Sequence, residues 1–230
     1  MCSSDLQWST VETLEQNVGT DYANQDVVSI FGWGTSGYNH GATAYQPYST
    51  IDTSSYYYAY GEYSYNLYDQ TGQADWSYAA NAASLGGHSD WTTLTSSQWK
   101  YLLSDRTDAS QKYGHGVVGS QNGLIILPDV FVLPDGLSFT AGNSAWTNSY
   151  TIAQWEKMEE NGAVFLPAAG DRNGSTAYGA GSVGTYWSST YYDSDPQDAY
   201  CVFFDSSDLG PQGRYNRFLG NSVRLVRIAE

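Results

Sequence analysis

The sequence predicts an α+β fold: an antiparallel sheet with two short helices and long loops rich in tyrosine and glycine. Two segments carry the signature of a helix start, and several short apolar runs have the pattern of strands. The chain has 24 glycines and 21 tyrosines but only 14% charged residues, a composition that disfavours a helical bundle. No linker-like segment interrupts the 230 residues, so we expect a single domain.

The composition excludes several classes of protein. Aromatic residues make up 16% of the chain, too many for a disordered acidic protein. With 24 acidic and 9 basic residues, the formal net charge is −15, so the chain lacks the basic surface typical of nucleic-acid binding. The longest apolar run, residues 124–127, stops at Pro128 and falls short of the roughly 20 residues that span a membrane.

The first predicted element is a buried strand over residues 27–33, which ends in a glycine-rich turn. Residues 34–87 follow as a long polar and aromatic stretch with little periodicity. We interpret this stretch as ordered loops whose tyrosine rings pack flat on the domain with their hydroxyls in water. A tyrosine-rich binding face is the alternative.

Two capping boxes predict the helices. Thr95 and Gln98 fit the first box, and that helix should run to about residue 103. Thr151 and Gln154 repeat the pattern, and the second helix should run to about residue 160, where an Asn-Gly pair supplies the stop. A tryptophan follows the glutamine in each box and should anchor its helix to the core.

The remaining elements are short strands, predicted at residues 116–118, 124–127, 163–167, 185–188, 199–204 and 222–228. The dipeptide Asn122-Gly123 predicts a hairpin turn ahead of the second strand. Within Tyr200–Phe204, alternating residues should face a ligand while Val202 and Phe204 face the core. In the last strand, apolar residues alternate with arginines except for one break, where residues 225 and 226 are both apolar.

No catalytic or metal-binding motif is present in the sequence. The three histidines, at positions 40, 88 and 115, are far apart and lie near glycines, so we interpret them as solvent-facing loop residues. An acidic loop with Asp193, Asp195 and Asp198 lacks the ligand spacing of an EF-hand, so we interpret it as solvated rather than calcium-binding. We therefore predict no catalytic residue, no metal and no cofactor.

The two cysteines, Cys2 and Cys201, allow one bridge but no disulfide scaffold, and no C-x-x-C pair offers zinc a thiolate site. The start Met1-Cys2-Ser3 fits a mature bacterial lipoprotein whose signal peptide has been replaced by a methionine, which would put a lipid anchor on Cys2. A cysteine at this position without a lipid is the alternative.

The segment between Ser188 and Ser222 differs in composition from the rest of the chain. It contains no Lys, Glu, Met or Trp and is rich in Tyr, Asp, Ser, Phe, Gly and Asn. Tyr, Ser, Gly and Asn are typical of antibody-like binding loops, and the flanking residues 164–170 and 223–227 have the pattern of framework strands. This arrangement favours recognition; a surface hairpin without a partner is the alternative, and composition alone does not separate them.

Four sequence blocks carry a resemblance to a known family: residues 91–102, 165–172, 184–190 (with Tyr186-Trp187-Ser188-Ser189) and 222–227 (Ser-Val-Arg-Leu-Val-Arg). In these blocks the chain resembles a bacterial family of major paralogous domains with a C-type lectin-like fold, related to formylglycine-generating enzymes. The family includes the variable proteins of diversity-generating retroelements. The resemblance covers about residues 27–228.

In such retroelements a reverse transcriptase copies a template repeat unfaithfully at adenines. The resemblance implies a scaffold over about residues 1–187, a variable binding segment over about 188–222 and a closing strand over 223–230. Diversified Asn codons cannot encode Lys, Glu, Gln, Met or Trp, so Gln197 and Gln212 should be fixed. The implied ligand-binding positions are Tyr192, Asp193, Asp195, Asp198, Tyr200, Cys201, Phe203, Asp205, Asp208, Gly210, Gly213, Tyr215, Asn216, Phe218, Leu219 and Asn221.

The same resemblance argues against enzyme activity. Formylglycine-generating enzymes use a pair of nearby C-terminal cysteines to bind copper, whereas this chain has only Cys201 in that region. Cys201 is then either the product of a diversified codon or a small buried residue of a strand.

We therefore expect a ligand-binding protein of receptor or adhesin type, located on the bacterial cell surface, secreted, or carried on a phage particle. Its partner would be a protein or a glycan, and the acidic face would favour a basic or neutral one. A structural or adhesive surface domain without diversification is the main alternative. An enzyme of unrecognised type would require a histidine to meet carboxylates in a pocket.

Overall fold

The computed structural model describes residues 32–34, 66–69, 75, 90–142, 145–173, 176–195 and 197–227. Most of the strand predicted at residues 27–33, most of the loops predicted at 34–87, and Cys2, His40 and His88 lie outside these described residues.

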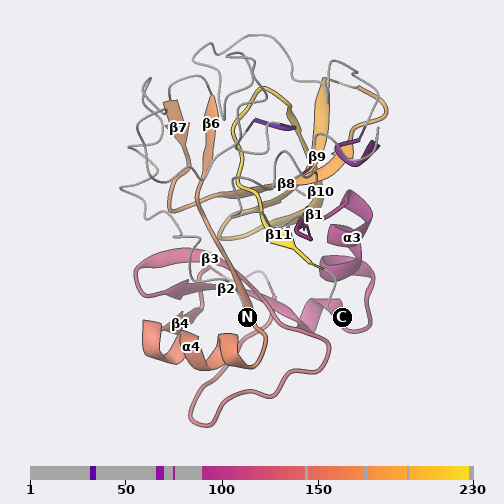
Figure 1. The fold of residues 1–230 in the computed structure, drawn as a ribbon. Helices are drawn as coiled ribbons and strands as arrows, with labels where there is room; N and C mark the ends of the chain where they lie inside the picture. The colour runs from indigo at the N-terminus through magenta and orange to yellow at the C-terminus, as the bar shows by residue number, and fades with distance from the viewer. Residues whose placement is uncertain are drawn as a thin grey trace.

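The described residues form a mixed α+β structure that consists mostly of small sheets (Figure 1). A four-stranded sheet has the order β4-β2-β3-β5, a three-stranded sheet has the order β10-β9-β8, and two strand pairs are β1–β11 and β6–β7. The elements are β1 (Thr92–Thr93), α3 (Ser96–Lys100), η4 (Tyr101–Asp105), η5 (Ala109–Gln111), β2 (Tyr113–Val118), β3 (Gln121–Ile126), β4 (Asn148–Tyr150), α4 (Ile152–Glu160), β5 (Val164–Pro167), β6 (Asp171–Asn173), β7 (Thr176–Tyr178), β8 (Gly184–Tyr191), β9 (Asp198–Phe204), β10 (Leu209–Asn216) and β11 (Leu225–Val226). All strand pairs are antiparallel except β2–β4, which is parallel.

Both predicted capping boxes are present. The backbone N–H of Gln98 donates to the Thr95 hydroxyl at 3.1 Å, and the Thr95 N–H donates to the Gln98 side chain at 2.8 Å. Thr151 and Gln154 make the same reciprocal pair at the start of α4. Such a cap stabilises a helix by about 1 kcal/mol. The second helix ends at Glu160 as expected, whereas α3 continues as a π-helical turn to Asp105.

The hairpin between β2 and β3 corrects one prediction. Asn122 and Gly123 do not form the turn, because they pair with Val117 and Gly116 inside the β2–β3 ladder. The turn is made instead by residues 119–120, where Gly119 adopts a φ of +63°. Gly123 is needed for a different reason: a β-carbon there would clash with the Leu166 carbonyl oxygen of β5.

The C-terminal strand is much shorter than predicted. Only Leu225–Val226 form β11, which pairs with Thr92 and Thr93 of β1. The other predicted residues between 222 and 227 are not part of β11, and Ile228 lies outside the described residues. Ser222 instead makes an isolated bridge with Tyr186.

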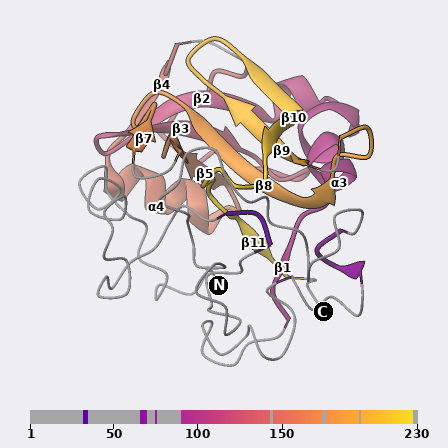
Figure 2. The ribbon, with the colours of Figure 1, turned by 90° about the horizontal axis from the view of Figure 1, so that it is seen from above.

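Three hydrophobic clusters hold the sheets and helices together. The first joins α3 to both sheets and includes Trp99, Leu124 and Phe204. The second lies on the other face of the three-stranded sheet around Trp33, Leu67, Trp187, Ala199 and Cys201. The third lies between the four-stranded sheet and α4 and includes Ile125, Trp155 and Met158. Figure 2 shows α3 beside β8, β9 and β10, with α4 on the opposite side of the molecule.

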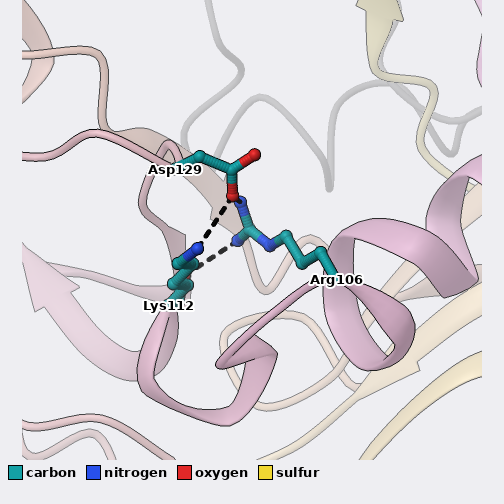
Figure 3. A network of polar contacts seen from close by, with 3 residues as sticks. All are labelled: Arg106, Lys112 and Asp129. Carbon is teal, nitrogen blue, oxygen red and sulfur yellow. Dashed lines mark hydrogen bonds and ion pairs between the residues drawn. The ribbon is translucent and has the colours of Figure 1, made fainter.

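One polar network fixes the loop that follows β3 (Figure 3). Asp129 accepts a hydrogen bond from Lys112 at 2.9 Å and one from Arg106 at 3.3 Å. The Lys112 hydrogen bond, together with the charges of both cations, lowers the pKa of Asp129. Beyond this anchor the loop leaves Val130 exposed over 87% of its surface, while Phe131 packs against the third cluster.

Candidate binding surface

The three-stranded sheet divides the predicted binding residues between two faces. Successive residues of a strand point to opposite faces, and Ala199 and Cys201 of β9 pack in the Trp33 cluster while Val202 and Phe204 pack against α3. The expectation that Val202 and Phe204 face the core is confirmed, since both are fully buried. Tyr200 therefore shares the α3 side of the sheet with them, and Phe203 lies on the opposite side.

Three side chains meet on the α3 side, and we name them the tyrosine–arginine cluster: Tyr192, Tyr200 and Arg214. Arg214 of β10 is the strand partner of Tyr200, and its guanidinium lies 4.8 Å from the centre of the Tyr192 ring. The two tyrosine rings meet edge to face with centroids 5.3 Å apart. Tyr192 reaches this place because its N–H donates to the Asp198 carbonyl at 3.0 Å, closing the loop between β8 and β9. The two tyrosines are half-buried and Arg214 is exposed.

A carboxylate–amide pair extends this cluster along the strands. Asn216 donates to Asp198 at 2.6 Å across the β9–β10 ladder. Burial and, after it, the charge of Asp195 raise the pKa of Asp198, although Arg214 and Asn216 act in the opposite direction. Burial, followed by the nearby charge of Asp193, raises the pKa of Tyr200. The tyrosine–arginine cluster and the carboxylates beside it thus bring together aromatic rings, a guanidinium and negative charges at a partly buried site.

Most of the predicted aspartates are used inside their own turns. Asp195 accepts the Gln197 N–H at 3.1 Å, and Asp208 accepts the Leu209 N–H at 2.8 Å. Asp205 accepts two backbone N–H groups and the Ser207 hydroxyl at 2.7 to 2.9 Å, and the Ser207 N–H bond is the main cause of its lowered pKa. These carboxylates therefore build the loops at the two ends of β9.

Two predicted binding residues lie inside the protein. Cys201 is 1% exposed in the Trp33 cluster, where burial raises the pKa of its thiol. Asn221 is fully buried and accepts a hydrogen bond from the Thr185 hydroxyl at 3.1 Å. In this conformation neither side chain reaches a ligand, and Cys201 matches the alternative interpretation of a small buried strand residue.

The other predicted positions are half-buried and lie away from the cluster. Phe203 pairs with Gly210, Tyr215 packs against the Trp33 cluster, and Phe218 and Leu219 lie in the turn after β10. The N–H of Leu219 donates to the carbonyl of Asn216 at 3.0 Å, which closes that turn. The predicted positions thus form no single continuous face.

Two arginines that the sequence analysis did not select hold the segment together. Arg217 is fully buried, with its guanidinium 4.1 Å from the Trp33 ring centre, and its Nε donates to the Asp198 carbonyl at 3.3 Å. Arg214 belongs to the cluster described above. The alternation of Gln212, Arg214 and Asn216 with smaller or aromatic residues was a strand signal in the sequence that could have revealed β10 and Arg214.

The interpretation of His115 as a solvent-facing loop residue is wrong. His115 lies in β2, is fully buried, and packs against Trp146 and Phe204 with centroid distances of 5.5 and 6.1 Å. Its glycine neighbours looked loop-like, but a β-carbon on Gly116 would lie 2.7 Å from the Asn148 carbonyl oxygen, so the glycine lets β4 approach. Burial lowers the pKa of His115.

Among the described residues, no group of three His, Cys, Asp or Glu side chains is arranged to hold a metal ion. Within the same parts of the chain, no helix has the length and apolar character needed to cross a membrane.

The chain was compared with protein families, curated proteins and solved structures, and no match was found.

Proposed function

We propose that the protein is a ligand-binding protein whose contact surface lies on the β8–β9–β10 segment of a C-type lectin-like scaffold. The observation that carries this proposal is the tyrosine–arginine cluster. It joins two large rings and a guanidinium at a half-exposed site, and these are the residue types that dominate binding energies at interfaces. The composition of the segment and the family resemblance point to the same place.

The glycines of the segment support its diversification. A β-carbon on Gly210 would have no neighbour closer than 3.9 Å, and one on Gly213 none closer than 3.4 Å. Both positions accept a β-carbon without moving the backbone. On Gly184, by contrast, which is outside the set of implied variable positions, a β-carbon would clash with the Phe204 ring.

The proposed contact surface is narrower than the set of predicted positions. It centres on the cluster and on Asp193, Asp198 and Asn216 beside it, and it excludes Cys201 and Asn221, which are buried. The partner is a protein or a glycan. The protein would act at the bacterial cell surface, outside the cell or on a phage particle.

Sequencing the region downstream of the gene tests the diversification. We expect a near-copy of the codons for residues 187–227 with Asn codons at the implied positions, next to a reverse-transcriptase gene. Finding neither would remove the argument for diversification and favour an undiversified surface domain.

Binding itself is tested on arrays of proteins and glycans with the wild-type chain and with the Tyr192→Ala and Tyr200→Ala variants. Tyr178→Ala is the matched control, because Tyr178 of β7 is 53% exposed and lies outside the cluster. We expect hits that the first two variants lose by at least about tenfold, as for the loss of an interface anchor, and that the control keeps. Hits that all three variants keep would contradict the proposed surface.

A further inference from the structure

Asp193 is the aspartate of this segment whose carboxylate is least engaged. Asp195, Asp205 and Asp208 each accept a backbone N–H, whereas the Asp193 carboxylate accepts a long hydrogen bond, at 3.5 Å, from the Ser194 hydroxyl. Asp193 is exposed, and its charge acts on Tyr200, whose ring is in contact with Tyr192. An acceptor with spare capacity therefore lies beside two aromatic rings.

Arg214 shows that the aromatic surface of the cluster accommodates a basic side chain. Its guanidinium already occupies one face of Tyr192, at a distance typical of a cation–π contact. Because this face is covered, Tyr192 does not offer it as a platform on which a sugar ring could stack. The structure thus holds one basic side chain on this aromatic surface and leaves a carboxylate next to it.

The local charge favours a second cation over an anion. The charges of Asp193 and Arg214 act on Tyr200, and those of Asp195, Arg214 and the buried Arg217 act on Asp198. Three carboxylates thus stand against two guanidinium groups here, and the whole chain carries −15. An acidic ligand would meet these carboxylates and the long-range negative potential of the chain. A basic side chain would gain from both and would place its charge next to aromatic rings.

We infer that the ligand is a protein segment that presents an arginine or lysine side chain, received by Asp193 next to Tyr200. This inference rests on the proposed function and specifies the partner of the same surface. Asp193 supplies the charge, the rings of the cluster supply the apolar contact for the methylene stem, and Arg214 keeps Tyr192 in place.

A random dodecapeptide display library tests the inference, because it offers the surface basic, acidic and uncharged segments at once. The library is selected on the wild-type protein, and binders retained by a Tyr200→Ala protein are then removed. We expect Arg and Lys to be enriched over Asp and Glu in the remaining peptides. Asp193→Asn should lower the affinity for these peptides by about tenfold, and raising the salt concentration should lower it further.

One control variant separates this site from general attraction to an acidic protein. Asp135→Asn removes an exposed aspartate in another loop and should leave binding within about twofold, because the same charge is lost away from the cluster. Thermal melting of each variant identifies any that fails to fold. Asp193→Asn changes only an exposed side chain, so the comparison of Asp193→Asn with Asp135→Asn holds even if Tyr200→Ala fails to fold.

The outcomes distinguish the two proposals. Selected peptides that depend on Tyr200 but are acidic or uncharged would overturn the inference and leave the binding surface standing. Basic peptides weakened equally by Asp135→Asn and Asp193→Asn would also overturn it. If no peptide and no array hit depends on Tyr192 or Tyr200, both the inference and the proposed function fail.

Discussion

The β2–β3–β5 part of the four-stranded sheet and the β9–β10 hairpin are both antiparallel, yet they tolerate side chains very differently. In the first region the glycines are sites of close backbone approach, as at Gly123 against β5. In the second region Gly210 and Gly213 have space for a β-carbon. Glycine therefore has two roles in these strands: in the four-stranded sheet a neighbouring strand requires it, and in the hairpin the surroundings leave room for a β-carbon.

The largest difference is expected within β9 itself. Phe204→Ala should lower the free energy of unfolding by about 4 kcal/mol, because the ring is fully buried and stacks on Tyr186. Its neighbour Phe203 is half-buried on the opposite face, so Phe203→Ala should cost only about 1 kcal/mol. Urea denaturation of both variants measures the two values. Equal costs would show that the two faces of β9 are not distinguished as described.

The next largest difference in stability is expected between the glycines of the two regions. Gly123→Ala should cost about 3 kcal/mol, since the new methyl group would be pressed against the Leu166 carbonyl oxygen and the Phe165 ring. Gly210→Ala should change stability by less than about 0.5 kcal/mol. Urea denaturation again measures both. A large cost at Gly210 would contradict the tolerance inferred for the hairpin.

The pH dependence of stability tests the contact between the two regions, because His115 of β2 packs against Phe204 of β9. Burial lowers the pKa of folded His115 below the value of 6.5 for the free side chain, although the charge of Asp205 acts in the opposite direction. As the pH falls below about 6.5, the unfolded chain takes up a proton that the folded chain does not. Stability should therefore fall with decreasing pH, at up to about 1.4 kcal/mol per pH unit, until folded His115 protonates.

Urea denaturation between about pH 7.5 and 5.5 measures this slope, since the range brackets the ordinary pKa of histidine. His115→Phe should remove most of it, because a neutral ring of similar shape replaces the imidazole. A slope that persists unchanged in this variant would assign the effect to other groups.

Among the substitutions that remove a side chain, the smallest loss of stability is expected at the proposed binding surface. Tyr192→Ala should lower stability by less than about 1 kcal/mol, because it removes a half-buried ring and an exposed cation–π contact. Calorimetric melting measures it, with Tyr178→Ala as the control. A loss as large as that at Phe204 would make Tyr192 a residue of the core and remove it from the contact surface.

Local signals in the sequence predicted local structure well. The capping boxes at Thr95 and Thr151 depend on residues three apart, so both helix starts were recognisable. Val202 and Phe204 were placed correctly because strand alternation is also local. Residues whose role depends on distant neighbours were interpreted wrongly. Gly123 is required by the close approach of β5, and the glycines around His115 are required by β4 and by the loop before β4.

The candidate binding surface also depends on contacts between residues that are distant in the sequence. Composition identified the segment between Ser188 and Ser222 but not its division into two faces, which depends on the register of β9 against β10. It also could not reveal that Cys201 lies under Trp33, a residue far away in the chain. β10 and Arg214 were missed because the glycines and the proline of this strand were given more weight than the alternation of Gln212, Arg214 and Asn216.

The register of β10 against β9 shifts between Gly210 and Gly213, which places Pro211 and Gln212 in a bulge of an outer strand. An unprotected outer strand is a template on which a second copy of the chain can polymerise. Pro211 has no N–H to offer such a copy, and a bulge interrupts the even spacing that strand addition requires. If the hairpin is diversified as proposed, the proline and the bulge leave this backbone protection in place whatever side chains the neighbouring positions carry.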